Sequence, residues 1–217
     1  MGLSLGAART STRFKCAFHS GQNSSEIVTA SEALQKQALV NGGFTVKCTD
    51  LLRQDHKIIL RSLNVLQSMV EGANGERIDQ EDAATLLRFI RRFADEYHHL
   101  KEEGALFPEV MRTSEAQGGP LRHLLFEHNQ ERSLVEGLED ALHTGKSSDF
   151  VLFANRLTDR VRNHIEKEDG ILFPILEVLI SNSLDEKVRT QFEKCQLDPG
   201  LLDDLRRLES KYLRNTV

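Results

Sequence analysis

Two short segments of the sequence repeat the same arrangement of an imidazole, a carboxylate and a proline. Residues 98–108 read HHLKEEGALFP and residues 164–174 read HIEKEDGILFP, and the two align without a gap. In each segment a histidine precedes a glutamate by four residues, as His98 with Glu102 and as His164 with Glu168. On a helix such a pair lies one turn apart on one face, so nitrogen and oxygen can meet in one small volume. The repeat indicates that two helices do the same chemical job.

Two further histidines lie within apolar stripes at helical spacing. His56 falls in the stripe of residues 52–70, and His128 falls in that of residues 121–142. A single histidine on such a stripe is more often a core residue, and a single HxxxE pair is more often a surface ion pair. A duplicated HxxxE pair together with two stripe histidines favours ligation instead. The candidate metal ligands are therefore six residues, namely His56, His98, Glu102, His128, His164 and Glu168.

The composition of this set indicates a pair of metal ions. Burying two carboxylates and four imidazoles without compensation would be very costly. Two bound cations remove that cost, because carboxylates can bridge them while neutral imidazoles complete their coordination. Mixed nitrogen and oxygen ligation without a thiolate suits iron, manganese or zinc. Six side chains are too many for one tetrahedral ion, so we expect a dinuclear site.

The residues around the two HxxxE pairs carry further expectations. His99 is one step off the face of His98, so we expect it beside the ligands or at the surface, and His123 should point away from them. Each pair is followed by a glycine and, four residues later, by a proline, which predicts a kink or a break in the helix. The apolar residues of the two LFP sequences should be core, namely Leu106, Phe107, Leu172 and Phe173.

The elements that must position these residues are helices. Helical periodicity extends over residues 49–72, 79–108, 120–145 and 147–171, with two shorter helices expected at about 184–195 and 200–214. Four long helices with short connections predict an all-α protein, an antiparallel up-down-up-down four-helix bundle with two extra C-terminal helices. We expect a metal-binding bundle at 46–180, a helical appendage at 181–217 and an N-terminal extension at 1–45 that is disordered or a targeting segment.

Composition excludes several classes of protein. The chain has 217 residues, with 28 Lys and Arg against 33 Asp and Glu, and this net charge of −5 argues against a nucleic-acid partner. No apolar run approaches the roughly 18–20 residues of a membrane span. Three widely spaced cysteines form no disulfide framework and favour a reducing compartment, so we expect a cytoplasmic protein. An organelle is the alternative if residues 1–25, which contain no acidic residue, are a transit peptide.

At these residues the chain resembles the hemerythrin-like HHE cation-binding family over roughly residues 48–180. The resemblance lies in His56, in the two HxxxE pairs with their trailing LFP, and in Glu127-His128. It implies a four-helix bundle around a non-haem di-iron centre with an oxo or hydroxo bridge, the six candidate residues as ligands and both glutamates bridging. Oxygen-carrying members have a further histidine four residues before the position of His128, where this chain has Leu124. The chain is in this respect more similar to the branch that repairs iron centres and responds to nitric oxide.

These observations predict a di-iron protein that binds O2 or NO, or that handles iron in oxidative or nitrosative stress. We expect two iron ions, with zinc or manganese ranked behind iron, and a monomer or homodimer. One alternative is a di-iron oxidase, peroxidase or NO reductase, for which Tyr97 or His99 is the nearest proton donor. Another is a helical interaction module with a structural metal. The sequence leaves open whether the protein is an enzyme and which ligand is physiological.

Overall fold

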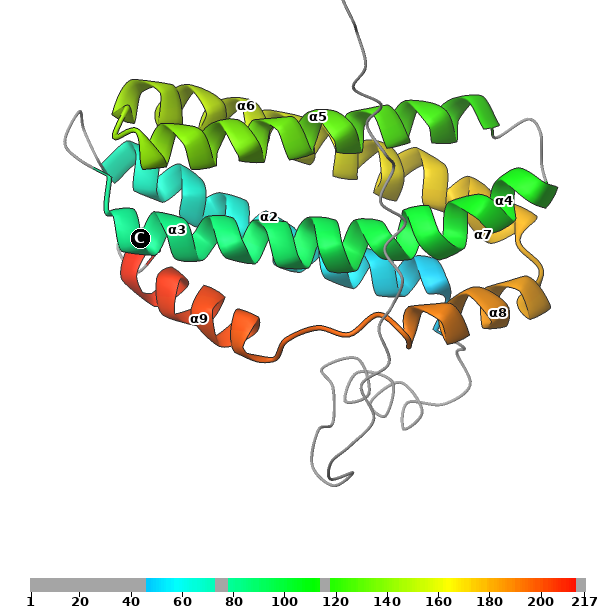
Figure 1. Ribbon diagram of the computed structural model, residues 1–217. Helices are drawn as coiled ribbons and strands as arrows, with labels where there is room; N and C mark the ends of the chain where they lie inside the picture. Colours follow the sequence, from blue (N-terminus) through cyan, green and yellow to red (C-terminus); the bar gives the residue numbers. More distant parts are fainter. Residues whose placement is uncertain (1–45, 73–77, 114–117, 214–217) are drawn as a thin grey trace, which may run out of the picture.

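A computed structural model describes residues 46–72, 78–113 and 118–213 (Figure 1). Every regular element in these ranges is a helix, which confirms the prediction of an all-α protein. The N-terminal extension predicted at 1–45 lies outside the described residues. Among the described helices, none is both long enough and apolar enough to cross a membrane.

Four long helical segments run through the molecule, two of them changing pitch along their length. The first and third are α2 (Cys48–Gly72) and α5 (Gly118–His143). The second comprises α3 (Gln80–Phe89), π-helical segments Ile90–His99 and Glu102–Leu106, and α4 (Phe107–Thr113). The fourth comprises α6 (Ser147–Lys167), the π-helical segment Glu168–Leu172, and α7 (Phe173–Leu179). Two further helices follow, α8 (Asn182–Phe192) and α9 (Gly200–Tyr212).

The helix does not break after either HxxxE pair but widens into a π-helical turn. The chain is π-helical from Glu102 and again from Glu168, and it returns to α-helix one residue before each proline. Pro108 and Pro174 therefore fall in the first turn of α4 and α7, where a missing N–H is tolerated. The leucine and phenylalanine before each proline are buried, as predicted.

The apolar core consists of two clusters separated along the long helices by polar residues. On α2, Leu52 belongs to one cluster and Ile59 to the other, with His56 between them. On α5, Leu124 and Val135 are divided in the same way. The smaller cluster contains the LFP residues and closes one end of the molecule. The predicted ligands therefore lie in a polar layer between two apolar clusters.

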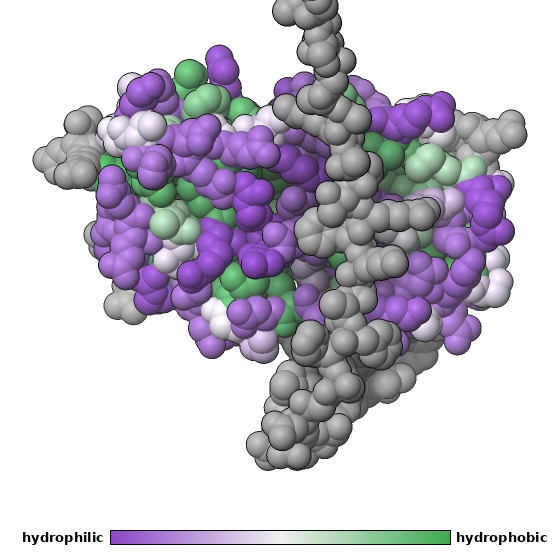
Figure 2. Space-filling model, viewed as in Figure 1, coloured by the Kyte–Doolittle hydropathy of each residue, from purple (hydrophilic) through white to green (hydrophobic). Residues whose placement is uncertain are grey.

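Helix α9 packs against α2 and α3, and α8 packs against α2 and the π-helical segment Glu102–Leu106 (Figure 1). The N–H of Cys48 donates to Asp185 of α8 over 2.8 Å, and Arg61 forms two 2.6 Å hydrogen bonds with Glu209 of α9. Asp82 of α3 is buried and accepts hydrogen bonds from three residues of α9, namely Lys211, Arg207 and Tyr212. Figure 2 shows that one face of the molecule is mainly hydrophilic, with hydrophobic areas between the charged side chains.

Asp82 should be the main polar anchor of α9. Burial opposes its charge, but hydrogen bonds from Lys211, Arg207 and Tyr212 outweigh burial and lower its pKa. We expect Asp82→Asn to reduce the free energy of unfolding by about 1–2 kcal/mol at pH 7, measured by urea denaturation. Because the folded-state pKa is lowered, this difference should be present above about pH 4 and should vanish as the pH falls through that pKa.

The matched control is Asp204→Asn on α9. Asp204 accepts a 2.7 Å hydrogen bond from Arg88 of α3, but both side chains are partly exposed. Exposed pairs of this kind contribute about 0–1 kcal/mol, so this variant should unfold close to the wild type. Equal losses in the two variants would contradict the special role of Asp82.

Candidate metal centre

The six candidate residues meet in the layer between the two apolar clusters. His56 comes from α2, His98 and Glu102 from the second helical segment, His128 from α5, and His164 and Glu168 from the fourth segment, and none is more than 1% exposed. They form two clusters in which one nitrogen or oxygen of each residue lies within 4.8 Å of the others. One cluster contains His56 and His98, the other contains His128 and His164, and both contain the two glutamates.

The two histidines of each cluster point their Nε2 atoms at one another. The Nε2 atoms of His56 and His98 are 3.1 Å apart, and those of His128 and His164 are 3.0 Å apart. Metal–imidazole bonds are about 2.0–2.1 Å long, so two such ligands at right angles place their nitrogens about 3 Å apart. Each imidazole pair therefore has the spacing that a shared cation requires.

The two glutamates lie between the imidazole pairs and face both of them. The Oε2 of Glu168 is 3.2 Å from His56 Nε2, while its Oε1 is 3.3 Å from His164 Nε2. Glu102 spans the clusters in the same way, with 3.6 Å to His98 Nε2 and 3.5 Å to His128 Nε2. Each carboxylate thus offers one oxygen to each cluster, which is the geometry of a bridging ligand.

The electrostatics of the glutamate pair fit a cation site. All four of these carboxylate oxygens are buried and lack a hydrogen-bond partner within the described part of the chain. Burial and the neighbouring Glu168 charge raise the pKa of Glu102 well above its usual range. Burial also lowers the pKa of His98 to about 4, which keeps its ring neutral and able to ligate. The donor set of nitrogen and oxygen atoms, with its unpartnered oxygens, is therefore suited to two divalent cations.

A second layer of carboxylates contacts the Nδ1 atoms of the four histidines. His56 pairs with Asp169 at 2.8 Å, His128 with Glu103 at 2.7 Å and His164 with Glu127 at 3.0 Å. Asp55 lies 3.5 Å from His98 Nδ1 and also accepts a 2.7 Å hydrogen bond from the buried Lys101. We call these four residues the outer carboxylates, namely Asp55, Glu103, Glu127 and Asp169. Such contacts fix the tautomer and the ring orientation of a ligating histidine.

The outer carboxylates were missed by the sequence reasoning, although the sequence contains a signal for them. Each one is the immediate neighbour of a candidate ligand: two precede His56 and His128, and two follow Glu102 and Glu168. An acidic residue beside a buried ligand on a helix points about 100° away from it, toward the adjacent helix. The adjacency thus predicts a contact with the next helix, which the repeat alone did not reveal.

The two halves of the site are related by a pseudo-twofold arrangement. When the two halves of the sequence are aligned so that His56 corresponds to His128, Leu52 corresponds to Leu124. Neither half therefore has a histidine four residues before the ligand on its first helix. The ring centres are 4.7 Å apart in both His56–His98 and His128–His164. Residues that correspond in the sequence repeat therefore occupy corresponding positions in the structure.

The described histidines outside the candidate set are His99, His123 and His143, and only His99 is buried. His99 is 5% exposed and its ring stacks on His128 with centres 3.8 Å apart, so of the two positions expected for it the structure has the one beside the ligands. His123 is exposed, as predicted. Tyr97 faces away from His99 toward Lys101, whose Nζ is 3.7 Å from the centre of the phenol ring.

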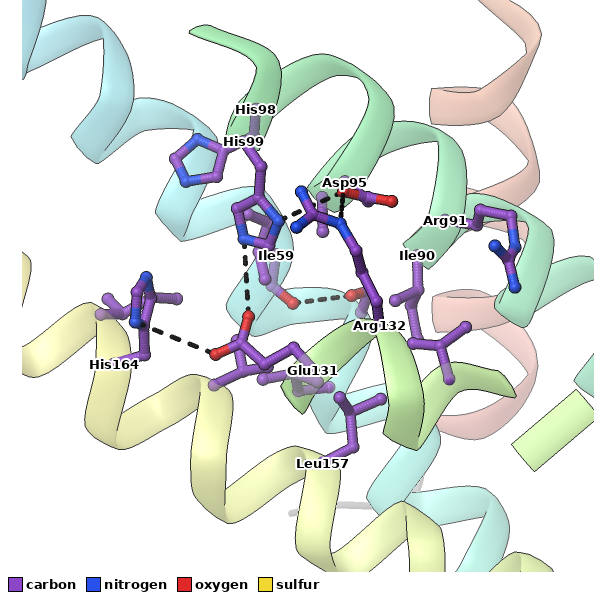
Figure 3. Close-up of a pocket in the computed structure, with 16 residues that line it drawn as sticks. Ile59, Ile90, Arg91, Asp95, His98, His99, Glu131, Arg132, Leu157 and His164 are labelled. Carbon is purple, nitrogen blue, oxygen red and sulfur yellow. Dashed lines mark hydrogen bonds and ion pairs between the residues drawn. The ribbon is translucent and has the colours of Figure 1, made fainter. Parts of the chain in front are cut away.

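Beside His99 lies Glu131, a buried carboxylate that the sequence analysis did not single out. Its Oε2 is 3.5 Å from His99 Nε2 and its Oε1 is 3.9 Å from His164 Nδ1 (Figure 3). Burial raises the pKa of Glu131 to about 7. Burial and the nearby histidines lower the pKa of His99 well below its usual range. The only sequence signal for Glu131 is a charge on the otherwise apolar face of α5.

Glu102→Gln should separate the stability of the metal-free protein from metal binding. The glutamine amide can donate to Glu168, and the substitution removes one unpartnered carboxylate. We therefore expect the free energy of unfolding of the metal-free variant to be about 1–2 kcal/mol higher than that of the wild type. The same change removes a bridging oxygen and should weaken metal binding. Denaturant unfolding with and without a chelator measures both effects. A metal-free variant less stable than the wild type would contradict the electrostatic account.

The outer carboxylates should tune metal affinity without contacting the metal. We expect Asp169→Asn and Glu103→Gln each to weaken metal binding by about 10–100-fold, measured by competition with a chelator. Glu136→Gln, an exposed position on α5, is the control and should bind as the wild type does. Equal affinities in all three variants would show that these contacts do not orient the histidines.

Comparison with known proteins assigns the chain to a family. The sequence model of the Hemerythrin HHE cation binding domain matches residues 48–176, which include all six candidate ligands and all four outer carboxylates. Neither the curated proteins nor the solved structures contain a significant match to this chain. The matched segment covers more than half of the sequence. The chain therefore belongs to the hemerythrin HHE cation-binding family.

Proposed function

We propose that the protein binds two iron ions through the six candidate residues. His56 and His98 would hold one ion, His128 and His164 would hold the other, and Glu102 and Glu168 would bridge them. The observation that carries the proposal is the set of four buried, unpartnered carboxylate oxygens between two imidazole pairs. Two cations supply the partners that these oxygens lack.

The ligand count favours iron and an exogenous ligand. Each ion would receive two imidazole nitrogens and two carboxylate oxygens from the chain, fewer than the six ligands of an octahedral ion. When bound, the iron pair supplies the change of redox state and an open coordination position for O2 or NO. The side chains hold the pair in a layer closed by apolar clusters, which limits the access of water.

We further propose that this ligand chemistry serves a response to oxidative or nitrosative stress rather than oxygen storage. Leu124 and its pseudo-twofold counterpart Leu52 are buried and cannot ligate, so the two ions have equal numbers of histidines. An oxygen carrier of this family has a fifth histidine, which makes its two irons unequal. Handling of the iron itself in such a stress is part of the same proposal.

An enzymatic function is the first alternative, because polar groups are buried beside the centre. A di-iron oxidase, peroxidase or NO reductase needs such groups near the open position, and the burial of His99 and Glu131 beside the candidate ligands supports this alternative. The second alternative is an interaction module in which a metal such as zinc or manganese is structural. Turnover of peroxide or NO supports the first, and a colourless protein with tightly bound zinc supports the second.

The proposal includes the organisation of the chain. It treats residues 46–180 as the metal-binding four-helix bundle of up-down-up-down topology and residues 181–217 as an appendage packed on it. The contacts of α9 with α2 and α3, and of α8 with α2 and the segment Glu102–Leu106, support this division. It also includes a cytoplasmic monomer or homodimer, with an organelle as the alternative location if residues 1–25 direct the chain there.

Metal analysis with an absorption spectrum tests the proposed centre. We expect about two irons per chain, with near-ultraviolet charge-transfer bands in the oxidised form, and an NO adduct in the reduced form. His98→Ala and His164→Ala should each lose at least one iron, since each removes a ligand from a different half. His143→Ala, at the exposed C-terminal end of α5, is the control and should keep both. Iron content that does not respond to the two ligand variants would overturn the proposal.

A further inference from the structure

A cavity of about 30 Å³ lies beside the metal centre, on the side of the larger apolar cluster (Figure 3). A buried water needs about 10–15 Å³ of such space, so the cavity has room for a molecule of two atoms. Its wall includes the candidate ligands His98 and His164 and the apolar side chains of Ile59, Leu157 and Ile165. The cavity is therefore lined by a residue from each half of the centre.

The pseudo-twofold relation divides the wall of this cavity into two chemically different sides. The shift that places His98 on His164 places His99 on Ile165. The shift that places His56 on His128 places Ile59 on Glu131. All four of these residues line the cavity. Where one side presents two isoleucines, the other presents an imidazole and a carboxylate.

The polar side contains atoms without hydrogen-bond partners. Within the described residues, His99 Nδ1 and Glu131 Oε1 are buried and make no hydrogen bond. The groups opposite them lie beyond hydrogen-bond distance, with Asp95 Oδ1 at 3.6 Å from His99 Nδ1 and His164 Nδ1 at 3.9 Å from Glu131 Oε1. The two residues face each other at 3.5 Å, from Nε2 to Oε2, and both are at most 5% exposed. Burying unpartnered polar groups is costly where isoleucine would suffice, as the opposite side demonstrates. Their placement therefore points to a ligand with which they interact.

Both polar residues adjoin the same half of the metal centre. His99 stacks on His128 at an angle of 13°, and Glu131 lies 3.9 Å from His164 Nδ1. Because the His99 ring is nearly parallel to that of His128, the in-plane lone pairs of the two rings point in parallel directions. They do not converge on one metal ion. This orientation favours a contact with a ligand over coordination of the metal by His99.

We propose that the cavity admits the diatomic ligand, and that the pair of His99 and Glu131 donates a hydrogen bond to it at the half of the centre held by His128 and His164. This inference rests on the proposed function, because it assumes a loaded centre that binds such a molecule. It makes the two halves inequivalent through residues outside the ligand set. The symmetric pair of Ile59 and Ile165 offers no hydrogen bond at the other half.

The test uses NO as the probe and exchanges each polar residue for its counterpart. His99→Ile and Glu131→Ile copy Ile165 and Ile59, and Ile165→Leu is the control on the apolar side. The readouts for the iron-loaded, reduced full-length chain are iron content, the NO dissociation rate and the N–O stretching frequency. We expect both isoleucine variants to keep two irons, to release NO about 10-fold faster and to shift the stretch, as the loss of one hydrogen bond predicts. The control should stay within about 2-fold of the wild type.

Each other outcome overturns the inference in a recognisable way. Unchanged dissociation and stretch in variants that keep both irons would refute the hydrogen bond while leaving the proposed function intact. Loss of iron from His99→Ile would make His99 a ligand. Failure of the iron-loaded wild type to bind NO would refute both proposals. If an isoleucine variant does not fold, the smaller substitutions His99→Ala and Glu131→Ala are compared by the same readouts, and wild-type behaviour in both would then count against the pair.

Discussion

The rest of the structure depends on two glutamates that are fully buried between two pairs of imidazoles. Their four oxygens have no hydrogen-bond partner in the described part of the chain, and burial together with the charge of Glu168 raises the pKa of Glu102. A carboxylate in such a place is tolerated only if a cation is bound or a proton is taken up. The two apolar clusters on either side supply the folding free energy that allows the polar layer to exist.

The outer carboxylates connect this layer to the packing of the helices. Asp55 of α2 contacts a histidine of the second segment, and Glu103 of that segment contacts a histidine of α5. Glu127 of α5 continues to the fourth segment, and Asp169 of the fourth segment returns to α2. A translation of one helix would therefore displace a ring on its neighbour. The precision of the site is a property of the whole set of four helical segments.

Most of the fold and the inner part of the site could be predicted from the sequence. The helical periods and the duplicated HxxxE pairs depend on spacing along one helix, which a sequence shows directly. The contacts of Asp169 and Glu131 depend on which face of a neighbouring helix lies opposite, and a single helix does not contain that information. The wide turns at Glu102 and Glu168 were not predicted either, because the proline signal indicates only that a regular helix cannot continue unchanged.

The duplication also shows where chemical differences between the two metal positions must originate. The ligands and the leucines before His56 and His128 are identical in both halves, so these residues cannot distinguish one ion from the other. Only residues that break the repeat can do so. Among those that line the cavity, His99 and Glu131 are the mismatches nearest to the centre. In a duplicated site the matching residues thus indicate what is bound, and the mismatched residues indicate where the next molecule binds.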